Sequence, residues 1–95
     1  MKPEKTKQQR LQEAVERGLR LGALLDDPAV IGWFDEVDDT AAAGCCDAVV
    51  DGDDERLRAE AMRLALCREL RGRMIGHVAE GVRAQEELNR KRDNG

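Results

Sequence analysis

Apolar and small side chains recur at alternating spacings of four and three residues near the start of the chain. That spacing puts them on one face of a helix, which we expect over about residues 4–25. The residues on this face are Leu11, Val15, Gly18, Gly22 and Leu25. Each glycine costs a helix about 1 kcal/mol relative to alanine. Either the close approach of another helix offsets this cost, or the helix simply tolerates it.

Asp27 and Pro28 separate this helix from a second one. Asp is a favoured N-cap residue, Pro fits the first helical position, and the residue before Pro avoids helical backbone. Apolar and small residues then recur at spacings of three and four, with acids mostly on the other side. We therefore expect a second helix over about residues 28–50. Its apolar and small positions are Val30, Trp33, Phe34, Val37, Ala41, Cys45, Ala48 and Val49.

Asp51 and Gly52 end this second helix, since Gly suits a left-handed C-terminal residue. Asp53 or Asp54 then caps a third helix over about 54–79. Its glycines predict a break near Glu80–Gly81, followed by a short C-terminal helix to about residue 91. The helix has two apolar faces, and one of them can pack on the first two helices. That face contains Leu57, Ala61, Leu64, Ile75, Ala79 and Val82.

The second apolar face of the third helix lies roughly opposite the first. Such a face needs a partner, unless the helix is central in its fold. We interpret it as a partner interface. Its residues are Met62, Leu66, Leu70 and Met74.

The pattern as a whole predicts an all-α fold with three main helices and a short C-terminal helix, arranged as a helical hairpin or small bundle. With 95 residues we expect one helical domain over 1–95, with a basic N-terminal segment over 1–10 that can be extended. So short a chain buries a modest core, which favours a homo-oligomer or a subunit of a larger assembly. The expected packing residues are Leu11, Val15, Leu25, Trp33, Phe34, Val37, Leu57, Leu64 and Ile75.

Charge is segregated along the chain. Residues 1–20 carry +3, residues 21–55 carry −11 with no Lys or Arg, and residues 56–95 carry +4. The segments can face each other within one fold or between copies, or the basic ends can meet an acidic partner. Contacts between the basic termini and phosphates are conceivable, but interleaved acids and the lack of stacking aromatics argue against nucleic acid. No apolar run approaches the ~18 residues of a membrane span, so we expect no membrane partner and synthesis inside the cell.

Candidate catalytic chemistry is sparse. The chain has no serine and no tyrosine, and its one histidine, His77, is interpreted as a surface or interface residue. The acids around Trp33 could hold a cation or form an acid/base pair, but capping and the polar face of the second helix account for them. Cys45, Cys46 and Cys67 with His77 have the wrong spacing for known zinc ribbons or fingers. We expect no enzyme, and no catalytic, cofactor or metal site.

The segment DAVVDGDDE also does not match the ligand pattern of an EF-hand. Counted from Asp47, the third position is Val49 and the twelfth is Arg58, where oxygen ligands are required.

Four motifs in order carry a family resemblance: RG-x-x-x-x-ALLDDP, WFDEV, DGDDERLRAEAMRLALCRELRGRM and HVAEG-x-x-A-x-x-EL. Over about residues 17–88 the chain resembles a family of short helical proteins encoded by tailed double-stranded-DNA bacteriophages, often within the head and structural region. The chain has AAAGCCDAV where that family would place an aromatic residue, and a longer basic N-terminus. The resemblance implies a virion or assembly accessory protein that contacts capsid, portal, neck or itself. It also implies the host cytoplasm at synthesis, with the virion as a second location. The alternative is a small regulatory binding module, either a host-factor inhibitor or a helical DNA-binding protein.

Overall fold

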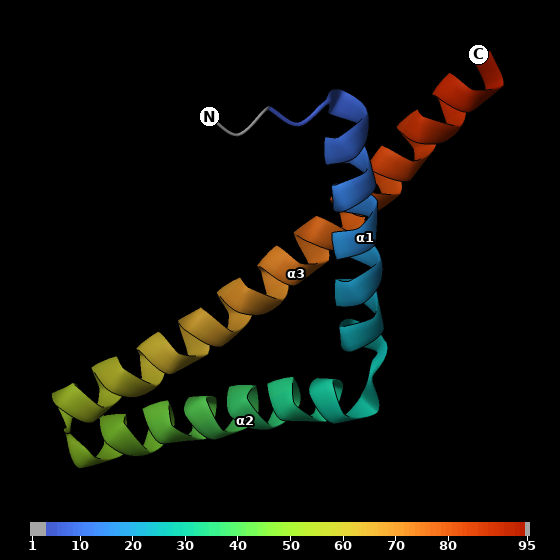
Figure 1. The fold of residues 1–95 in the computed structure, drawn as a ribbon. Coiled ribbons are helices and arrows are strands. Elements are labelled where there is room, and N and C mark those ends of the chain that lie inside the picture. The colour runs from blue at the N-terminus through green and yellow to red at the C-terminus, as the bar shows by residue number, and fades with distance from the viewer. Residues whose placement is uncertain (1–3, 95) are drawn as a thin grey trace. The chain divides into compact units, whose positions relative to one another are not determined.

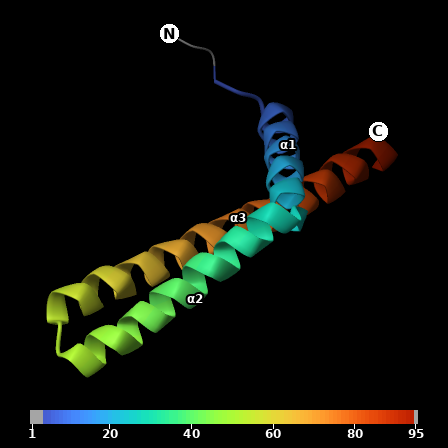
Figure 2. The same ribbon diagram turned by 90° about the horizontal axis from the view of Figure 1, so that it is seen from below.

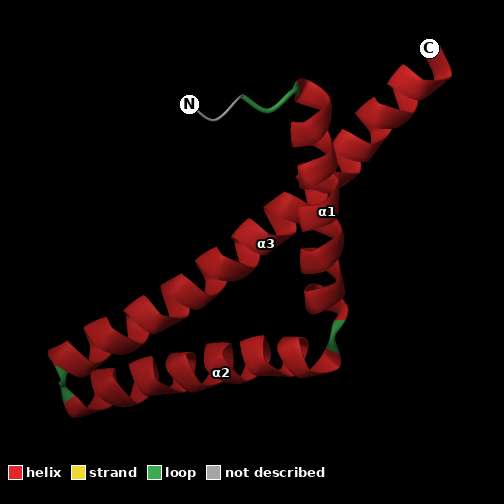
Figure 3. Cartoon of the chain, in the orientation of Figure 1, coloured by secondary structure: helices red, strands yellow, loops and turns green. Residues whose placement is uncertain are grey.

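The computed structural model describes residues 4–94, which form three helices joined by two short connections (Figures 1 and 3). These are α1 (Lys7–Asp26), α2 (Pro28–Asp51) and α3 (Asp54–Asn94). No strand occurs between residues 4 and 94. The prediction of an all-α fold is confirmed. None of the helices in this part of the chain is long and apolar enough to cross a bilayer.

Local side-chain chemistry sets the helix ends. The carboxylate of Asp27 accepts a hydrogen bond of 2.8 Å from the Ala29 backbone N–H, and Pro28 takes the first helical position of α2. Gly52 ends α2 with φ 67°, a left-handed conformation that glycine adopts without steric cost. Asp53, the first of the two candidate caps, accepts from the Arg56 backbone N–H at 3.0 Å. The predicted boundaries between the helices are therefore confirmed.

The start of α1 depends on a capping box that the apolar pattern does not reveal. The Thr6 hydroxyl accepts from the Gln9 backbone N–H at 3.1 Å, and the Gln9 side chain accepts from the Thr6 N–H at 2.9 Å. Helix α1 therefore begins at Lys7, which places part of the basic segment 1–10 within the helix. Residues 1–3 of that segment lie outside the described residues.

The break expected near Glu80–Gly81 is wrong. Helix α3 continues through Gly72, Gly76 and Gly81 to Asn94, so its C-terminal piece is not a separate helix. A single glycine weakens a helix by about 1 kcal/mol and does not by itself stop it. The glycines of α3 stand among strong helix formers, and no proline or capping residue accompanies them.

The chain divides into two compact units, each described separately. One contains residues 26–73, namely α2 with the first half of α3. The other contains α1 with the second half of α3, from residue 74 on.

Residues 26–73 form an antiparallel helical hairpin, in which α2 lies beside the first half of α3 (Figures 1 and 2). Small residues line the C-terminal half of the α2 side, at Ala41, Gly44 and Ala48, and the Glu60 side chain from α3 lies against Gly44. Side chains from α3 pack against this side of α2 at alternating spacings of three and four residues, as in a coiled coil. The inward positions of α2 are Val30, Phe34, Val37, Ala41, Gly44 and Ala48. Those of α3 are Leu57, Glu60, Leu64 and Cys67.

In the second unit α1 crosses the second half of α3 (Figure 1). Gly18 and Gly81 lie in contact at this crossing. A Cβ atom built on Gly18 would lie 3.0 Å from the Cα of Gly81 and 3.1 Å from the backbone oxygen of His77. Of the two explanations for the α1 glycines, close helix approach is confirmed at Gly18. At Gly22 a Cβ would meet only Val78 Cγ2 at 3.8 Å, which is ordinary contact.

The prediction that Trp33 and Ile75 pack in the interior is wrong, because these side chains are 52% and 53% exposed. Trp33 and Phe34 are adjacent and point about 100° apart around the helix, so only one of them can face α3. Phe34 takes that place and is buried. Ile75 lies one residue beyond the inward position at Met74. The apolar face predicted to pack on the first two helices is also wrong at three further positions, because Ala61, Ala79 and Val82 are exposed. The other expected packing residues, Leu11, Val15, Leu25, Val37, Leu57 and Leu64, are half-buried.

Candidate interaction surface

The described chain exposes far more large apolar side chains than it buries. Among residues 4–94, the buried apolar side chains are Phe34, Ala41, Ala48, Cys67 and Ala84. Only Phe34 among them is large. The hairpin of residues 26–73 meanwhile exposes seven large apolar side chains: Ile31, Trp33, Val49, Val50, Met62, Leu66 and Leu70. An interaction site is expected only where such side chains lie next to one another on one side of the hairpin.

Three of these side chains form a row along α3. Met62, Leu66 and Leu70 are spaced four residues apart, so they lie on one side of the helix, and they are 64%, 58% and 48% exposed. Met74, the fourth residue of the expected interface, is half-buried and belongs to the unit with α1. The structure thus places three of the four predicted residues on an open surface. Their role as an interface stays a prediction.

Trp33 marks a shallow hollow between α2 and α3 that sequence reasoning did not reveal. The hollow has a volume of about 280 Å³ and is lined by Trp33, Glu36, Val37, Thr40 and Arg63. Trp33 packs edge-on against Phe34, with ring centroids 5.1 Å apart and planes at 67°. The sequence signal for an exposed Trp33 was the three- and four-residue spacing of α2, which includes Phe34 and leaves Trp33 out. That signal is weak, because several positions in the spacing are glycine or alanine and do not stand out as core residues.

Arg63 connects this hollow to the apolar row. Leu66 and Leu70 follow Arg63 by three and seven residues, so they share its side of α3. Trp33, Arg63, Leu66 and Leu70 therefore occupy one side of the hairpin, which we name the Trp33 face. Met62 lies at its outer edge.

Charged side chains lie at the margins of the Trp33 face, and their ion pairs within the chain are long. Arg63 Nη1 lies 3.5 Å from Glu60 Oε2, and Arg56 lies 3.9 Å from Asp47 and 3.7 Å from Asp51. At these distances the contacts are ion pairs without good hydrogen-bond geometry. Glu60 Oε2 is buried and accepts no hydrogen bond.

The opposite side of the hairpin carries a closer pair. Arg68 Nε donates to Asp38 Oδ1 at 3.1 Å. Arg71, farther along α3, places its guanidinium 5.8 Å from the centre of the Phe34 ring, a cation–π distance.

The acids in and just before α2 have local structural roles. Asp27 caps α2, while Asp35, Glu36 and Asp39 are exposed on its surface. No group of three or more His, Cys, Asp or Glu side chains within residues 4–94 is placed to hold a metal ion.

The cysteines and the histidine are dispersed. Cys67 is buried between the hairpin helices, Cys45 is half-buried and Cys46 is exposed. His77 lies in the other unit, where its Nδ1 is 3.3 Å from Glu80 Oε2. Nothing brings these four side chains together.

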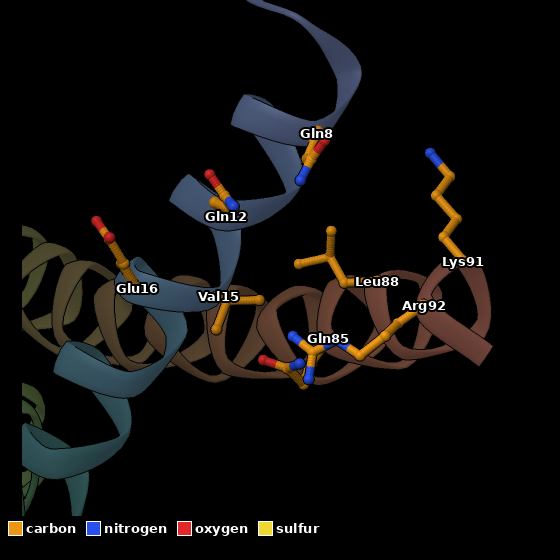
Figure 4. Close-up of a pocket in the computed structure, with 8 residues that line it drawn as sticks. All are labelled: Gln8, Gln12, Val15, Glu16, Gln85, Leu88, Lys91 and Arg92. Carbon is orange, nitrogen blue, oxygen red and sulfur yellow. The ribbon is translucent and has the colours of Figure 1, made fainter. Parts of the chain in front are cut away.

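A cleft of about 760 Å³ opens between α1 and the end of α3 (Figure 4). Val15 and Leu88 supply its apolar side chains, and the other lining residues are Gln8, Gln12, Glu16, Gln85, Lys91 and Arg92. Both charge signs are present and no side chain is buried, so the cleft has no clear ligand chemistry.

The ion pair between Lys7 and Glu87 joins α1 to α3 near this cleft, at 2.9 Å. The hydrogen bond and positive charge of Lys7 lower the pKa of the Glu87 carboxyl. Burial opposes that shift, and the charges of Lys91 and Arg90 add to it.

Comparisons of the chain with known protein families, with curated proteins and with solved structures find no match. The candidate site therefore rests on the geometry of the chain itself.

Proposed function

We propose that this chain is a non-enzymatic assembly module that acts through protein–protein contacts on α3. The observation that carries the proposal is the row of Met62, Leu66 and Leu70, each about half exposed or more on a helix whose other side already packs on α2.

The energetics favour a partner. Full burial of a Leu or Met side chain contributes about 1.5–3 kcal/mol, so covering this row is worth several kcal/mol. The hairpin buries only one large side chain of its own, Phe34. Units this small are marginally stable alone, and association is a common way to stabilise them.

The motif order from residue 17 to residue 88 supports a more specific role. It resembles short helical proteins from the structural region of tailed bacteriophages. We therefore propose a virion or assembly accessory protein that contacts capsid, portal or neck subunits or its own copies. It would be made in the host cytoplasm and could be retained in the virion.

The test is photo-crosslinking from position 62 during particle assembly, followed by mass spectrometry of purified virions and procapsids. We expect crosslinks to a structural protein or to the chain itself, and loss of these crosslinks in the double variant Leu66→Glu with Leu70→Glu. The control is Ile31→Glu with Val49→Glu, which removes two exposed aliphatic side chains elsewhere on the hairpin and adds the same charge. Absence from virions and procapsids, together with no crosslinks, would refute the proposal.

A further inference from the structure

The Trp33 face is apolar in its middle and charged at its margins. Trp33 from α2 and Leu66 and Leu70 from α3 are 52%, 58% and 48% exposed. Glu36 and Arg63 adjoin them in the hollow at Trp33. An apolar centre with an aromatic anchor and a charged rim is typical of a protein–protein interface.

The two helices of this face carry opposite charge. Helix α2 has six acids and no Lys or Arg, whereas residues 54–73 of α3 have six Arg and four acids. The charges nearest the Trp33 face follow the same division, with Glu36 and Asp47 on α2 and Arg56 and Arg63 on α3.

A face of this kind is complementary to itself. If α2 of one copy lies on α3 of another, acids meet arginines, and a two-fold axis repeats the contact. Pairing α2 with α2 would instead set acids against acids. The contacts of Arg56 and Arg63 within the chain, at 3.5–3.9 Å, leave their guanidinium donors without good hydrogen bonds. Within the part of the chain that the structure describes, Glu36 has no ion-pair partner.

We propose that the Trp33 face binds the same face of a second copy of this chain, with α2 of each copy on α3 of the other. Leu66 and Leu70 then pack around Trp33 of the partner copy, and Arg63 pairs with the partner's Glu36. This inference rests on the proposed function, because it names the partner of the same α3 surface.

The first experiment measures the mass of the purified full chain by light scattering after size exclusion, across a concentration series. We expect about twice the chain mass of 10.6 kDa. Leu66→Glu with Leu70→Glu should weaken self-association by about 100-fold or more, since charges would enter an apolar contact. Trp33 fluorescence should shift to shorter wavelength as the wild type associates, and should not shift in this variant. Far-UV circular dichroism verifies folding, and Leu66→Gln replaces the double variant if helicity is lost.

The matched control is Ile31→Glu with Val49→Glu. Both positions are exposed, and at 100° per residue each lies about 160° around α2 from Trp33. The change in charge and the loss of aliphatic side chains equal those of the Leu66 and Leu70 variant. The control should self-associate like the wild type.

A charge exchange tests the arrangement of the two copies. Arg63→Glu alone and Glu36→Lys alone should each weaken self-association by about 10-fold. An equimolar mixture of the two variants should restore it, because each copy then meets an opposite charge. An effect confined to one chain cannot be restored by mixing. Arg68→Glu and Asp38→Lys provide the control mixture, since that pair is hydrogen-bonded within one chain at 3.1 Å.

Three results would overturn the proposal: a folded wild type that stays monomeric at about 100 μM, a dimer unchanged by Leu66→Glu with Leu70→Glu, or no rescue on mixing the Arg63 and Glu36 variants. If the pure chain is monomeric but position 62 crosslinks to another particle protein, the second copy is the wrong partner and the proposed function stands. If neither self-association nor crosslinks appear, both fall.

Discussion

Gly18 and Gly81 bring the backbones of α1 and α3 into direct contact. A Cβ atom on Gly81 would lie 3.1 Å from the Cα of Gly18 and 3.0 Å from the backbone oxygen of Ala14. Each glycine therefore makes room for the other, and neither helix can yield without moving backbone. This contact offsets the cost of placing two glycines inside helices.

Gly18→Ala should lower the free energy of unfolding by about 1–3 kcal/mol, because the added methyl group overpacks a contact between backbones. Gly76→Ala is the matched control, since a Cβ there meets nothing within 4 Å. It should raise stability by about 1 kcal/mol through helix propensity. Urea denaturation followed by circular dichroism measures both. Equal stabilisation by the two substitutions would contradict the close crossing.

The sequence predicted the two junctions between the helices well, because turn chemistry is local. Asp27, Pro28 and Gly52 determine their own backbone conformations, whatever the tertiary structure. The third helix was harder, because whether a glycine ends a helix depends on what packs beside it. Gly81 lies at a helix crossing that no single helix pattern reveals.

The inward face of α3 was harder to predict still. It includes Glu60, a charged residue, and Arg71 covers the Phe34 ring from the same helix. A search for apolar residues does not count Glu60 and Arg71 as inward positions. The predicted packing face of α3 was therefore rotated toward Ile75. Of the four residues predicted as a partner interface, Met62, Leu66 and Leu70 are exposed, whereas Met74 is half-buried. The uniform four-residue spacing made this row visible in the sequence, and its role as an interface stays a prediction.

Glu60 offers a test of the hairpin interior. Its Oε2 is buried without a hydrogen bond, and its side chain lies against Gly44, where a Cβ would be only 2.8 Å from the Glu60 Cδ. Glu60→Met keeps a similar unbranched shape and removes the unsatisfied acceptor. We expect the free energy of unfolding to rise by about 1 kcal/mol. Thermal denaturation measures the change. Destabilisation by Glu60→Met would mean that the ion pair with Arg63 outweighs the burial cost.

The Lys7–Glu87 pair predicts a pH dependence in the unit that contains α1. The pKa of Glu87 is lower in the folded chain than in the unfolded chain, so the pair stabilises folding above the unfolded-state pKa. That stabilisation is lost as pH falls through the lowered folded-state pKa. Lys7→Gln should raise the pKa of Glu87 toward its ordinary value, as carboxyl ¹³C NMR titration would detect.

Lys5→Gln is the control for that titration. Lys5 pairs with Glu13 at 2.7 Å, so this variant removes the same charge two residues away and should leave the pKa of Glu87 nearly unchanged. Equal shifts from both variants would indicate a general charge effect in place of a specific pair.

The two adjacent aromatic residues should differ sharply in their contribution to stability. Phe34 is 4% exposed between the hairpin helices, whereas Trp33 is 52% exposed. Phe34→Ala should cost about 3–5 kcal/mol, because it leaves a cavity at the one large buried side chain of the hairpin. Phe34→Leu should cost less and still remove the contact with the Arg71 guanidinium, worth about 0.5–1 kcal/mol.

Trp33→Ala should change the stability of the monomer by only about 1 kcal/mol. Denaturation followed by circular dichroism at low concentration, where the chain is monomeric, separates these effects from association. If Trp33→Ala destabilised the monomer as much as Phe34→Ala, Trp33 would face α3 and could not anchor an interface.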